Sequence, residues 1–471
     1  MRLSTTVRGR GFTFDGLHDL MAKANEVKAG DSLAGLAAQS ATERMAAKTL
    51  LADVPVGAFV EEPAVDPAKD EVSRIILEDL DPAVRGEIAS TSLGELRERL
   101  LEADGEEMLR LGRGLTSEAI AGVTRLMSNL DLVSAAAKIR VEATCRTTIG
   151  RPGTLSSRLQ PNHPTDDLGG ILASVRDGLS FAVGDAVVGL NPADDTVDSV
   201  KRVMDGISEY VHDELGVPTQ VCILAHITSQ IEALRRGGRC DLVFQSIAGS
   251  QKACESFGIT AKLLSEGAAA VRAGRRDLGE NVLYFETGQG SELSSEGHHG
   301  IDQLTMEARC YGLARRYKPF LVNTVVGFIG PEYLYDGRQV IRAGLEDHFM
   351  GKLHGLPMGV DVCHTNHMDA DQNDLENLAV LLTAAGCTYF MGIPMGDDVM
   401  LNYQTTSFHD VSALRELFGR SPIRPFEEWM EREGILAGGR LTASAGDLTH
   451  FDANRRNPWD SLSSNTLLNP A

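Results

Sequence analysis

The residue most informative about chemistry is Glu286, which follows the apolar run Val-Leu-Tyr-Phe at 282–285. An ionised carboxylate is costly at the end of a buried strand unless it is paired. Glu286 is therefore expected to bind a cationic group, and a role as general base stays open. A second carboxylate, Asp361, directly follows the apolar residue Val360. If both runs are strands of one sheet, the two carboxylates can face a single point.

Other apolar runs are also followed by polar side chains. Arg158 and Gln160 come after the first run, and Asn191 comes after the second. Two carboxylates beside an amide such as Gln160 form a good site for a small ammonium group, through charge-assisted hydrogen bonds. Arg158 with Asn191 suits a hydroxyl or another oxygen. The alternative is that these polar ends only cap helices or bridge strands.

Eight short apolar runs position these residues, and we expect strands at 144–149, 185–190, 220–225, 242–247, 282–286, 321–328, 358–363 and 387–392. Amphipathic helices are expected between them, including 197–214, 303–316 and 373–385. Strands that alternate with helices imply parallel βαβ units. Eight units predict an α/β fold, a closed (β/α)₈ TIM barrel with its site at the carboxyl ends of the strands. An open, doubly wound sheet is the competing architecture.

The chain is long for one domain and is expected to have three parts. Residues 1–115 form a mostly helical N-terminal module, with helical spacing at 17–27, 34–51 and 72–80. A capping box at Ser92 and Glu95 begins a helix through 101, and another helix runs from 116 to about 139. Residues 116–436 form the catalytic barrel. The polar tail, 437–471, is expected to be partly disordered or to dock a partner.

Charge and cysteine usage exclude several classes of protein. A net charge of −21 argues against nucleic acid and anionic lipid as partners, because both need clustered Lys and Arg. The seven cysteines are scattered and form no C-x-x-C pair, which indicates free thiols in a reducing compartment. The chain has neither a signal-peptide pattern nor an apolar run of about 18 residues. The expected location is the cytoplasm, with no membrane association.

Motifs for other chemistries are weak. Asp361, His364 and His367 suggest a metal-dependent barrel hydrolase, which is the alternative function, but their spacing matches no common zinc signature. No metal ligand from the protein is therefore expected. Gly288 and Gly290 lack the third glycine of a dinucleotide fingerprint. The residues alone thus predict a barrel enzyme for a small, polar and cationic substrate, and leave the reaction open.

The segments at the strand ends resemble the large (heavy) subunit of ethanolamine ammonia-lyase, an adenosylcobalamin-dependent enzyme. The segments that carry this resemblance are Ala-Asn-Glu at 24–26 with Gly-Asp at 30–31, and then 158–162, 184–192, 283–290, 325–335, 343–353 and 396–406. The likeness extends over almost the whole chain, from Met1 to about Gly446. Long matches in the same order are far more specific than a single glycine motif. The family fold, a (β/α)₈ barrel with an added N-terminal region, agrees with the strand count.

The resemblance implies that ethanolamine is converted to acetaldehyde and ammonia by adenosylcobalamin radical chemistry. It implies that Arg158 and Asn191 bind the substrate hydroxyl, while Gln160, Glu286 and Asp361 bind its ammonium. Arg158, Glu286 and Asp361 are the implied catalytic residues. Phe328 and Leu401 correspond to apolar walls of the pocket. Positions that contact cobalamin in the family correspond here to Pro192, Gln245, Ser294 and Met400.

The resemblance also implies partners and a setting for ethanolamine degradation. The family binds cobalamin between this chain and a separate small subunit, so a hetero-oligomer that also contains several copies of this chain is expected. The implied location is the cytoplasm, either free or inside a bacterial microcompartment. A non-catalytic scaffolding subunit is a further alternative, which the intact set of polar residues at the strand ends disfavours.

Overall fold

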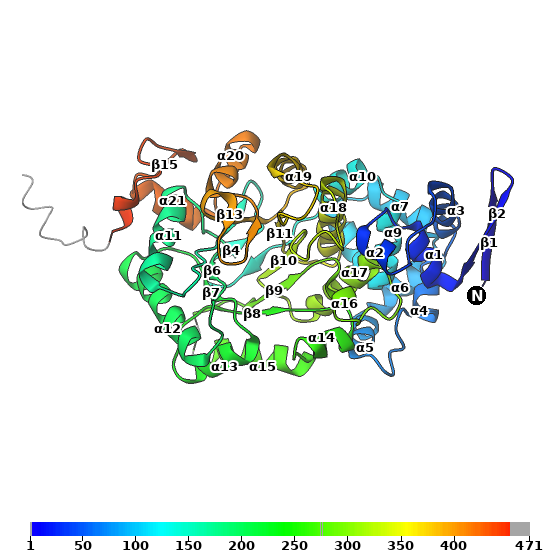
Figure 1. The fold of residues 1–471 in the computed structure, drawn as a ribbon, viewed down its shortest axis with the longest axis horizontal. Coiled ribbons are helices and arrows are strands. Elements are labelled where there is room, and N and C mark those ends of the chain that lie inside the picture. The colour runs from blue at the N-terminus through cyan, green and yellow to red at the C-terminus, as the bar shows by residue number, and fades with distance from the viewer. Residues whose placement is uncertain (1, 274, 276, 453–471) are drawn as a thin grey trace, which may run out of the picture.

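The computed structural model describes residues 2–273, 275 and 277–452, and within them eight parallel strands close into a barrel (Figure 1). The strands are β5 (Ser156–Leu159), β6 (Val187–Leu190), β7 (Val221–Ile223), β8 (Leu242–Ser246), β9 (Leu283–Thr287), β10 (Leu321–Val325), β11 (Met358–Asp361) and β12 (Tyr389–Gly392). Each strand pairs with the next, and β12 closes on β5 with Tyr389 opposite Ser156. The predicted (β/α)₈ barrel is confirmed, and the open sheet is excluded.

Helices on the outside of the barrel connect the strands. They are α11 (Leu168–Ser180), α12 (Val197–Ser208), which continues as the π-helix η1 (Glu209–Glu214), α13 (Ile227–Arg235), α14 (Gln251–Ser256), α15 (Ala261–Arg272), α16 (Ser291–Ser294), α17 (Gln303–Arg316), α18 (Gly337–Leu353), α19 (Gln372–Ala384) and α20 (Phe408–Phe418). Side chains of Asp302, Asp336 and Asp371 cap the amino ends of α17, α18 and α19. The helices predicted at 197–214, 303–316 and 373–385 are confirmed to within one residue.

The strand expected at 144–149 is wrong as a barrel strand. This segment is a small antiparallel hairpin, β3 (Ala143–Thr144) and β4 (Thr148–Ile149), at the amino ends of β8 and β9. The first barrel strand is β5, whose residues Ser156, Ser157 and Arg158 are polar and fully buried. A buried strand with these residue types has no apolar pattern, and the sequence therefore predicts a strand in the neighbouring segment instead.

The N-terminal region begins with a hairpin that the sequence pattern did not predict, β1 (Arg2–Val7) and β2 (Arg10–Asp15). Helices follow: α1 (Gly16–Ala24), α2 (Ala29–Leu33), α3 (Ala41–Ala52), α4 (Ala58–Glu61), α5 (Glu71–Glu78), α6 (Pro82–Ile88), α7 (Leu93–Glu102), α8 (Gly105–Gly112), α9 (Ser117–Arg125) and α10 (Asn129–Ala136). The capping box of Ser92 and Glu95 is confirmed. The single helix expected from 116 to 139 is wrong, because Ser128 and Asp131 form a capping box that starts α10 as a separate helix.

Buried ion pairs connect the N-terminal helices to α17 and α18. Arg309 of α17 contacts Asp70 at 2.9 Å and also Glu118, and Lys28 contacts Glu346 of α18 at 2.9 Å. Burial opposes the charge of Glu346, but Lys28 and Arg342 hold its pKa down to about 2. Figure 1 shows the blue and cyan helices gathered on the α17 and α18 side of the barrel. The N-terminal helices therefore pack against the helices behind β9 and β10.

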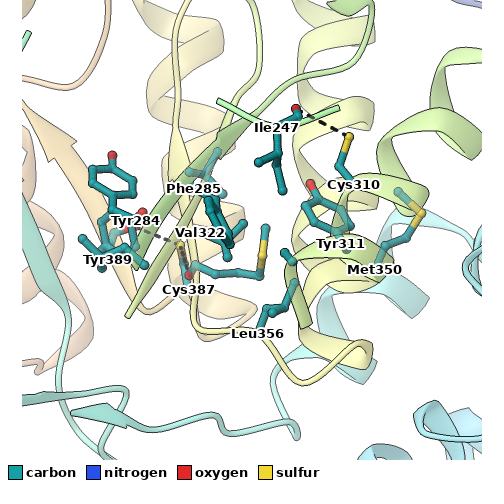
Figure 2. Close-up of a cluster of buried hydrophobic side chains, with 14 of the residues drawn as sticks. Ile247, Tyr284, Phe285, Cys310, Tyr311, Val322, Met350, Leu356, Cys387 and Tyr389 are labelled. Atoms are coloured by element: carbon teal, nitrogen blue, oxygen red, sulfur yellow. Dashed lines mark hydrogen bonds between the residues drawn. The ribbon is translucent and has the colours of Figure 1, made fainter. Parts of the chain in front are cut away.

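Apolar side chains fill the space between the strands and these helices (Figure 2). Figure 2 shows Tyr284 beside Tyr389, with Phe285 lying apart from them toward Tyr311 of α17. Phe285 also makes an edge-to-face contact with Tyr317, at 6.0 Å between ring centroids. Because side chains alternate along a strand, Tyr284 and Glu286 share the inner face of β9, while Phe285 and Thr287 face the helices.

The C-terminal part packs beside α11 and α12 (Figure 1). After α20 come α21 (Arg424–Arg432), β15 (Leu436–Ala437), β16 (Arg440–Leu441) and the short 3₁₀ helix η3 (Leu448–Phe451). The ring of Phe451 is buried and stacks on Trp429, at 5.5 Å between centroids. The expected disorder or docking in the tail concerns 437–471, of which residues 453–471 lie outside the described residues.

Packing of α8 against α18 gives a stability test. A β-carbon added at Gly112 would lie 2.1 Å from the carbonyl oxygen of Leu353. Gly112→Ala is therefore expected to lower the free energy of unfolding by about 2 kcal/mol, through overpacking. Gly86, an exposed helical glycine, has no described atom within 4 Å of such a β-carbon. Gly86→Ala should leave stability unchanged or raise it by up to about 1 kcal/mol. Chemical denaturation measures both, and equal effects would contradict the predicted packing.

Candidate active site

A cavity of about 510 Å³ opens at the carboxyl ends of the barrel strands. Its lining combines polar ends of strands with apolar walls, and includes Gln160, Asn191, Gln245, Glu286, Asp361, Phe328, Leu401 and Tyr403. This is the end of the barrel where (β/α)₈ enzymes place their sites. The cavity is far larger than a two-carbon molecule needs. Five polar residues predicted from the sequence, Arg158, Gln160, Asn191, Glu286 and Asp361, meet at or directly beneath it.

Arg158 lies at the centre of this site and is fully buried. Its Nη1 donates to Glu286 at 2.7 Å, and its Nη2 donates to Gln160 at 2.5 Å and to Asn191 at 2.7 Å. Burial opposes the charge, but the neighbouring Tyr284 and Glu286 raise the pKa of Arg158 above its usual value. Gly189 makes room for the side chain, since a β-carbon there would lie 2.9 Å from Arg158 Nε.

Glu286 finds its cationic partner within the protein. Besides Arg158, its Oε1 accepts a hydrogen bond from Tyr284 at 2.8 Å and one from Asn323 at 3.3 Å. Its side chain is 14% exposed, whereas Arg158 is not exposed at all. Glu286 is therefore held in place on one side and open to the cavity on the other.

Asp361 has a different environment. Its Oδ2 accepts from the hydroxyl of Tyr403 at 3.0 Å, and its Oδ1 accepts from the hydroxyl of Thr405. Burial raises the pKa of Asp361 to about 7, and the nearby charge of Glu286 adds to this shift, while the hydrogen bonds from Thr405 and Tyr403 oppose it. Among the described residues, no cation lies within ion-pair distance of Asp361. A bound ammonium group would supply the missing positive charge.

Three of the six residues expected at the walls and at the cofactor line this cavity. Phe328, 38% exposed, and Leu401 line the cavity, and Phe328 makes an edge contact with Tyr403 at 5.3 Å. Gln245 also lines it, with its Oε1 accepting from the backbone of Ile227. The others adjoin the lining in sequence or follow β9: Pro192 comes after Asn191, Met400 precedes Leu401, and Ser294 is the last residue of α16.

Sequence reasoning gave no role to Tyr284, Asn323, Tyr403, Thr405 or Asp398. Two of these residues, Tyr284 and Asn323, are related to Glu286 by their positions in the strands. Tyr284 lies two residues before Glu286 and so shares its face of the strand, and Asn323 is paired with Glu286 in the register of β9 and β10. The other three come from the loop after β12, and only the closed barrel brings this loop to β5 and β11.

The metal-dependent alternative finds no support in the geometry. Both oxygens of Asp361 are already bound by Tyr403 and Thr405. His364 directs its Nδ1 to the carbonyl of Thr365. No group of three or more His, Cys, Asp or Glu side chains among the described residues is arranged to hold a metal ion. His226, which caps α13, contacts Thr228 and the carbonyl of Phe257, as a satisfied rim histidine would.

Comparison with known proteins identifies the family. The family model described as "Ethanolamine ammonia lyase large subunit (EutB)" matches residues 12–444. The chain belongs to this family. It is 52% identical to the ethanolamine ammonia-lyase large subunit of Escherichia coli (strain K12) over 453 residues, which cover 96% of this chain and all of that protein. It is 51% identical, over the same length and coverage, to the ethanolamine ammonia-lyase large subunit of Salmonella typhimurium (strain LT2). The resemblance predicted from the strand ends is confirmed.

In this member of the ethanolamine ammonia-lyase large-subunit family, the raised pKa of Asp361 makes stability depend on pH. A carboxyl group whose pKa is about 7 in the folded protein and near 4 in the unfolded chain costs stability as pH rises between these values. Asp361→Asn removes this cost. When the pH is raised from 5 to 8, the unfolding free energy of Asp361→Asn should therefore increase relative to that of wild type by about 2 kcal/mol.

Thermal or chemical denaturation at the two pH values measures this difference. Asp397→Asn is the matched control, because Asp397 is exposed and its carboxylate accepts only from Gln404 among the bonds described. The control should change with pH in parallel with wild type. If Asp361→Asn also ran parallel to wild type, the assigned pKa shift would be wrong.

Proposed function

We propose that this chain is the large, catalytic subunit of an ethanolamine ammonia-lyase, which converts ethanolamine to acetaldehyde and ammonia with adenosylcobalamin. One observation carries the proposal. A buried arginine and two carboxylates meet at one cavity, in a chain that matches curated ethanolamine ammonia-lyase large subunits over their entire length. The substrate has a hydroxyl at one end and an ammonium at the other, which fits this division of charge.

In this proposal the two ends of ethanolamine bind different partners. Arg158 and Asn191 bind the hydroxyl, since the guanidinium can stabilise charge that develops on oxygen. Glu286, Asp361 and the carbonyl oxygen of Gln160 bind the ammonium. Glu286 is already balanced by Arg158, so the substrate cation adds its charge beside Asp361, whose pKa it would lower. In this proposal the ionised form of Asp361 is electrically balanced by the ammonium group of ethanolamine.

The residues are also compatible with the cofactor. The chemistry that adenosylcobalamin supplies when bound is homolysis of its cobalt–carbon bond and the removal and return of a hydrogen atom. Beyond the polar residues the cavity has space and apolar walls, including Phe244, Phe257, Phe328 and Leu401. Pro192, Gln245, Ser294 and Met400 are the residues proposed to contact the cofactor. The chain's own task is to hold the two-carbon cation rigidly and to exclude water and stray hydrogen donors.

A small subunit is proposed to cover the cofactor, and copies of this chain to assemble with it in a hetero-oligomer. The relatives' name, "large subunit", supports a second kind of chain. We further propose a cytoplasmic location, free or within a bacterial microcompartment. All seven cysteines are buried and free, as expected in a reducing compartment. Separately, none of the helices in the described residues has the length and apolar character to cross a bilayer.

Glu286 and Phe328 should differ sharply in their effect on turnover. Glu286→Gln removes the charge that balances Arg158 and binds the ammonium, so kcat/KM should fall by about a hundredfold or more. Phe328→Leu keeps an apolar wall and should cost less than about tenfold. Acetaldehyde formation by the reconstituted enzyme measures both, with melting temperatures as the folding control. A near-wild-type kcat/KM in Glu286→Gln would remove this residue from the proposed mechanism.

Reconstitution tests the whole proposal. The chain is co-expressed with an ethanolamine ammonia-lyase small subunit, supplied with ethanolamine, and assayed for acetaldehyde with and without adenosylcobalamin. The expected result is product only when cofactor and both subunits are present, with ammonia released in equal amount. Absence of cofactor-dependent product from folded complex would refute the proposed function.

A further inference from the structure

Asp398, a buried carboxylate in the loop after β12, binds the site residues from the side away from Arg158. Its Oδ2 accepts from the side-chain amides of Gln160 at 2.7 Å and Asn162 at 2.8 Å. Its Oδ1 accepts from the backbone N–H groups of Met400 at 3.0 Å and Leu401 at 2.7 Å. Each oxygen thus receives two donors, so Asp398 acts only as an acceptor in this network.

This arrangement determines which way the amide of Gln160 points. A glutamine side chain can be turned over with little change in shape, so its orientation depends on its partners. Asp398 accepts and therefore requires the nitrogen, Nε2, on its side. Arg158 only donates and therefore requires the oxygen, Oε1, on the other side, at 2.5 Å. Both partners demand the same orientation.

Neighbouring residues reinforce the same direction. Gln160 Nε2 also donates to the hydroxyl of Tyr403 at 3.1 Å, which in turn donates to Asp361. The orientation of Asn162 is independently determined, because its Oδ1 accepts from the backbone N–H of Asn191 at 2.8 Å. Its amide nitrogen must then face Asp398. The amides of Gln160 and Asn162 are thus ordered around Asp398, and the hydroxyl of Tyr403 connects Gln160 to Asp361.

We infer that Asp398 is a positioning residue that fixes the amide of Gln160, so that its carbonyl oxygen, and not its nitrogen, faces the substrate ammonium. This inference rests on the proposed function. An ammonium group only donates hydrogen bonds, so a reversed Gln160 would present a donor to a donor. Asp398 touches neither substrate nor reacting atoms, and acts on specificity for a cationic amine through Gln160.

Asp398→Asn tests this with little change in shape. The oxygen of the new amide is retained by the backbone of Met400 and Leu401, so its nitrogen must face Gln160. The side-chain amide of Gln160 is then expected to reverse its orientation and lose its hydrogen bond to Arg158. Its nitrogen would then face the ammonium group. The Kd and the KM for ethanolamine should rise about tenfold or more, as for the loss of a hydrogen bond to a charged group.

A charge swap distinguishes positioning from a general electrostatic effect. Gln160→Glu alone puts two carboxylates in contact and should weaken binding. Combined with Asp398→Asn, it restores a donor facing an acceptor, keeps the net charge of the wild-type pair, and accepts from Arg158 as before. The double variant should bind ethanolamine at least threefold more tightly than Asp398→Asn, with the contacts to Asn162 and to the Tyr403 hydroxyl left unmatched. Asp397→Asn removes the same charge one residue away, from an exposed position, and should change Kd less than twofold.

Ethanolamine binding is measured by calorimetry on the complex with the small subunit, loaded with hydroxocobalamin, which lacks the cobalt–carbon bond and cannot turn over. KM follows from the adenosylcobalamin-loaded enzyme, and melting temperatures report folding. If Asp398→Asn alone lowers the melting temperature, the double variant should recover both stability and affinity. An unchanged Kd in Asp398→Asn, or a double variant that binds no better, overturns the inference while wild-type activity upholds the proposed function. Wild-type complex that neither binds nor converts ethanolamine would overturn both.

Discussion

The structure of the site depends on one constraint, the complete burial of the guanidinium of Arg158 inside the barrel. A buried charge without partners is strongly destabilising, so each neighbouring group must offer an acceptor in the right place. Glu286 from β9, Gln160 from the end of β5 and Asn191 from the end of β6 do so. The ends of three strands are thereby joined through a single side chain, and the polar residues that could bind substrate are held in a fixed arrangement before it arrives.

The same constraint separates the two carboxylates. Glu286 shares its charge with Arg158, whereas Asp361 has only hydroxyl partners and a pKa raised by burial to about 7. Two chemically similar groups therefore have different electrostatic environments within one site. In the proposed function, a cationic substrate would complete the balance at Asp361. This division explains how the site can select an ammonium without holding a permanently unpaired charge.

Much of the fold and of the candidate site could be predicted from the sequence, and the features that could not be predicted have physical causes. Strands such as β9 and β11 are buried on both faces and read as apolar runs. The sequence pattern does not reveal strand β5, because Ser156, Ser157 and Arg158 are polar. Such residues are stable in a buried strand only with partners such as Asp185, which accepts a hydrogen bond from Ser157 at 2.8 Å. The strand ends predicted five polar residues that the barrel brings together at one cavity. The residues that orient them, Asp398 and Tyr403, lie far along the chain from Gln160, and no local pattern links them.

The strands that carry the site also form hydrogen bonds with helices on the outside of the barrel. Glu286 faces the cavity, while the next residue, Thr287, donates its hydroxyl to Glu307 of α17. Thr324 of β10 donates to Asp347 of α18 at 2.9 Å, and Gln289 donates to the same carboxylate at 2.7 Å. Neighbouring residues of α17 and α18, Arg309 and Glu346, form the buried ion pairs with the N-terminal region. A displacement of those helices would therefore reach Glu286 through α17, α18 and the hydrogen bonds that join them to β9 and β10. The N-terminal region thus supports the geometry of the site as well as the stability of the barrel.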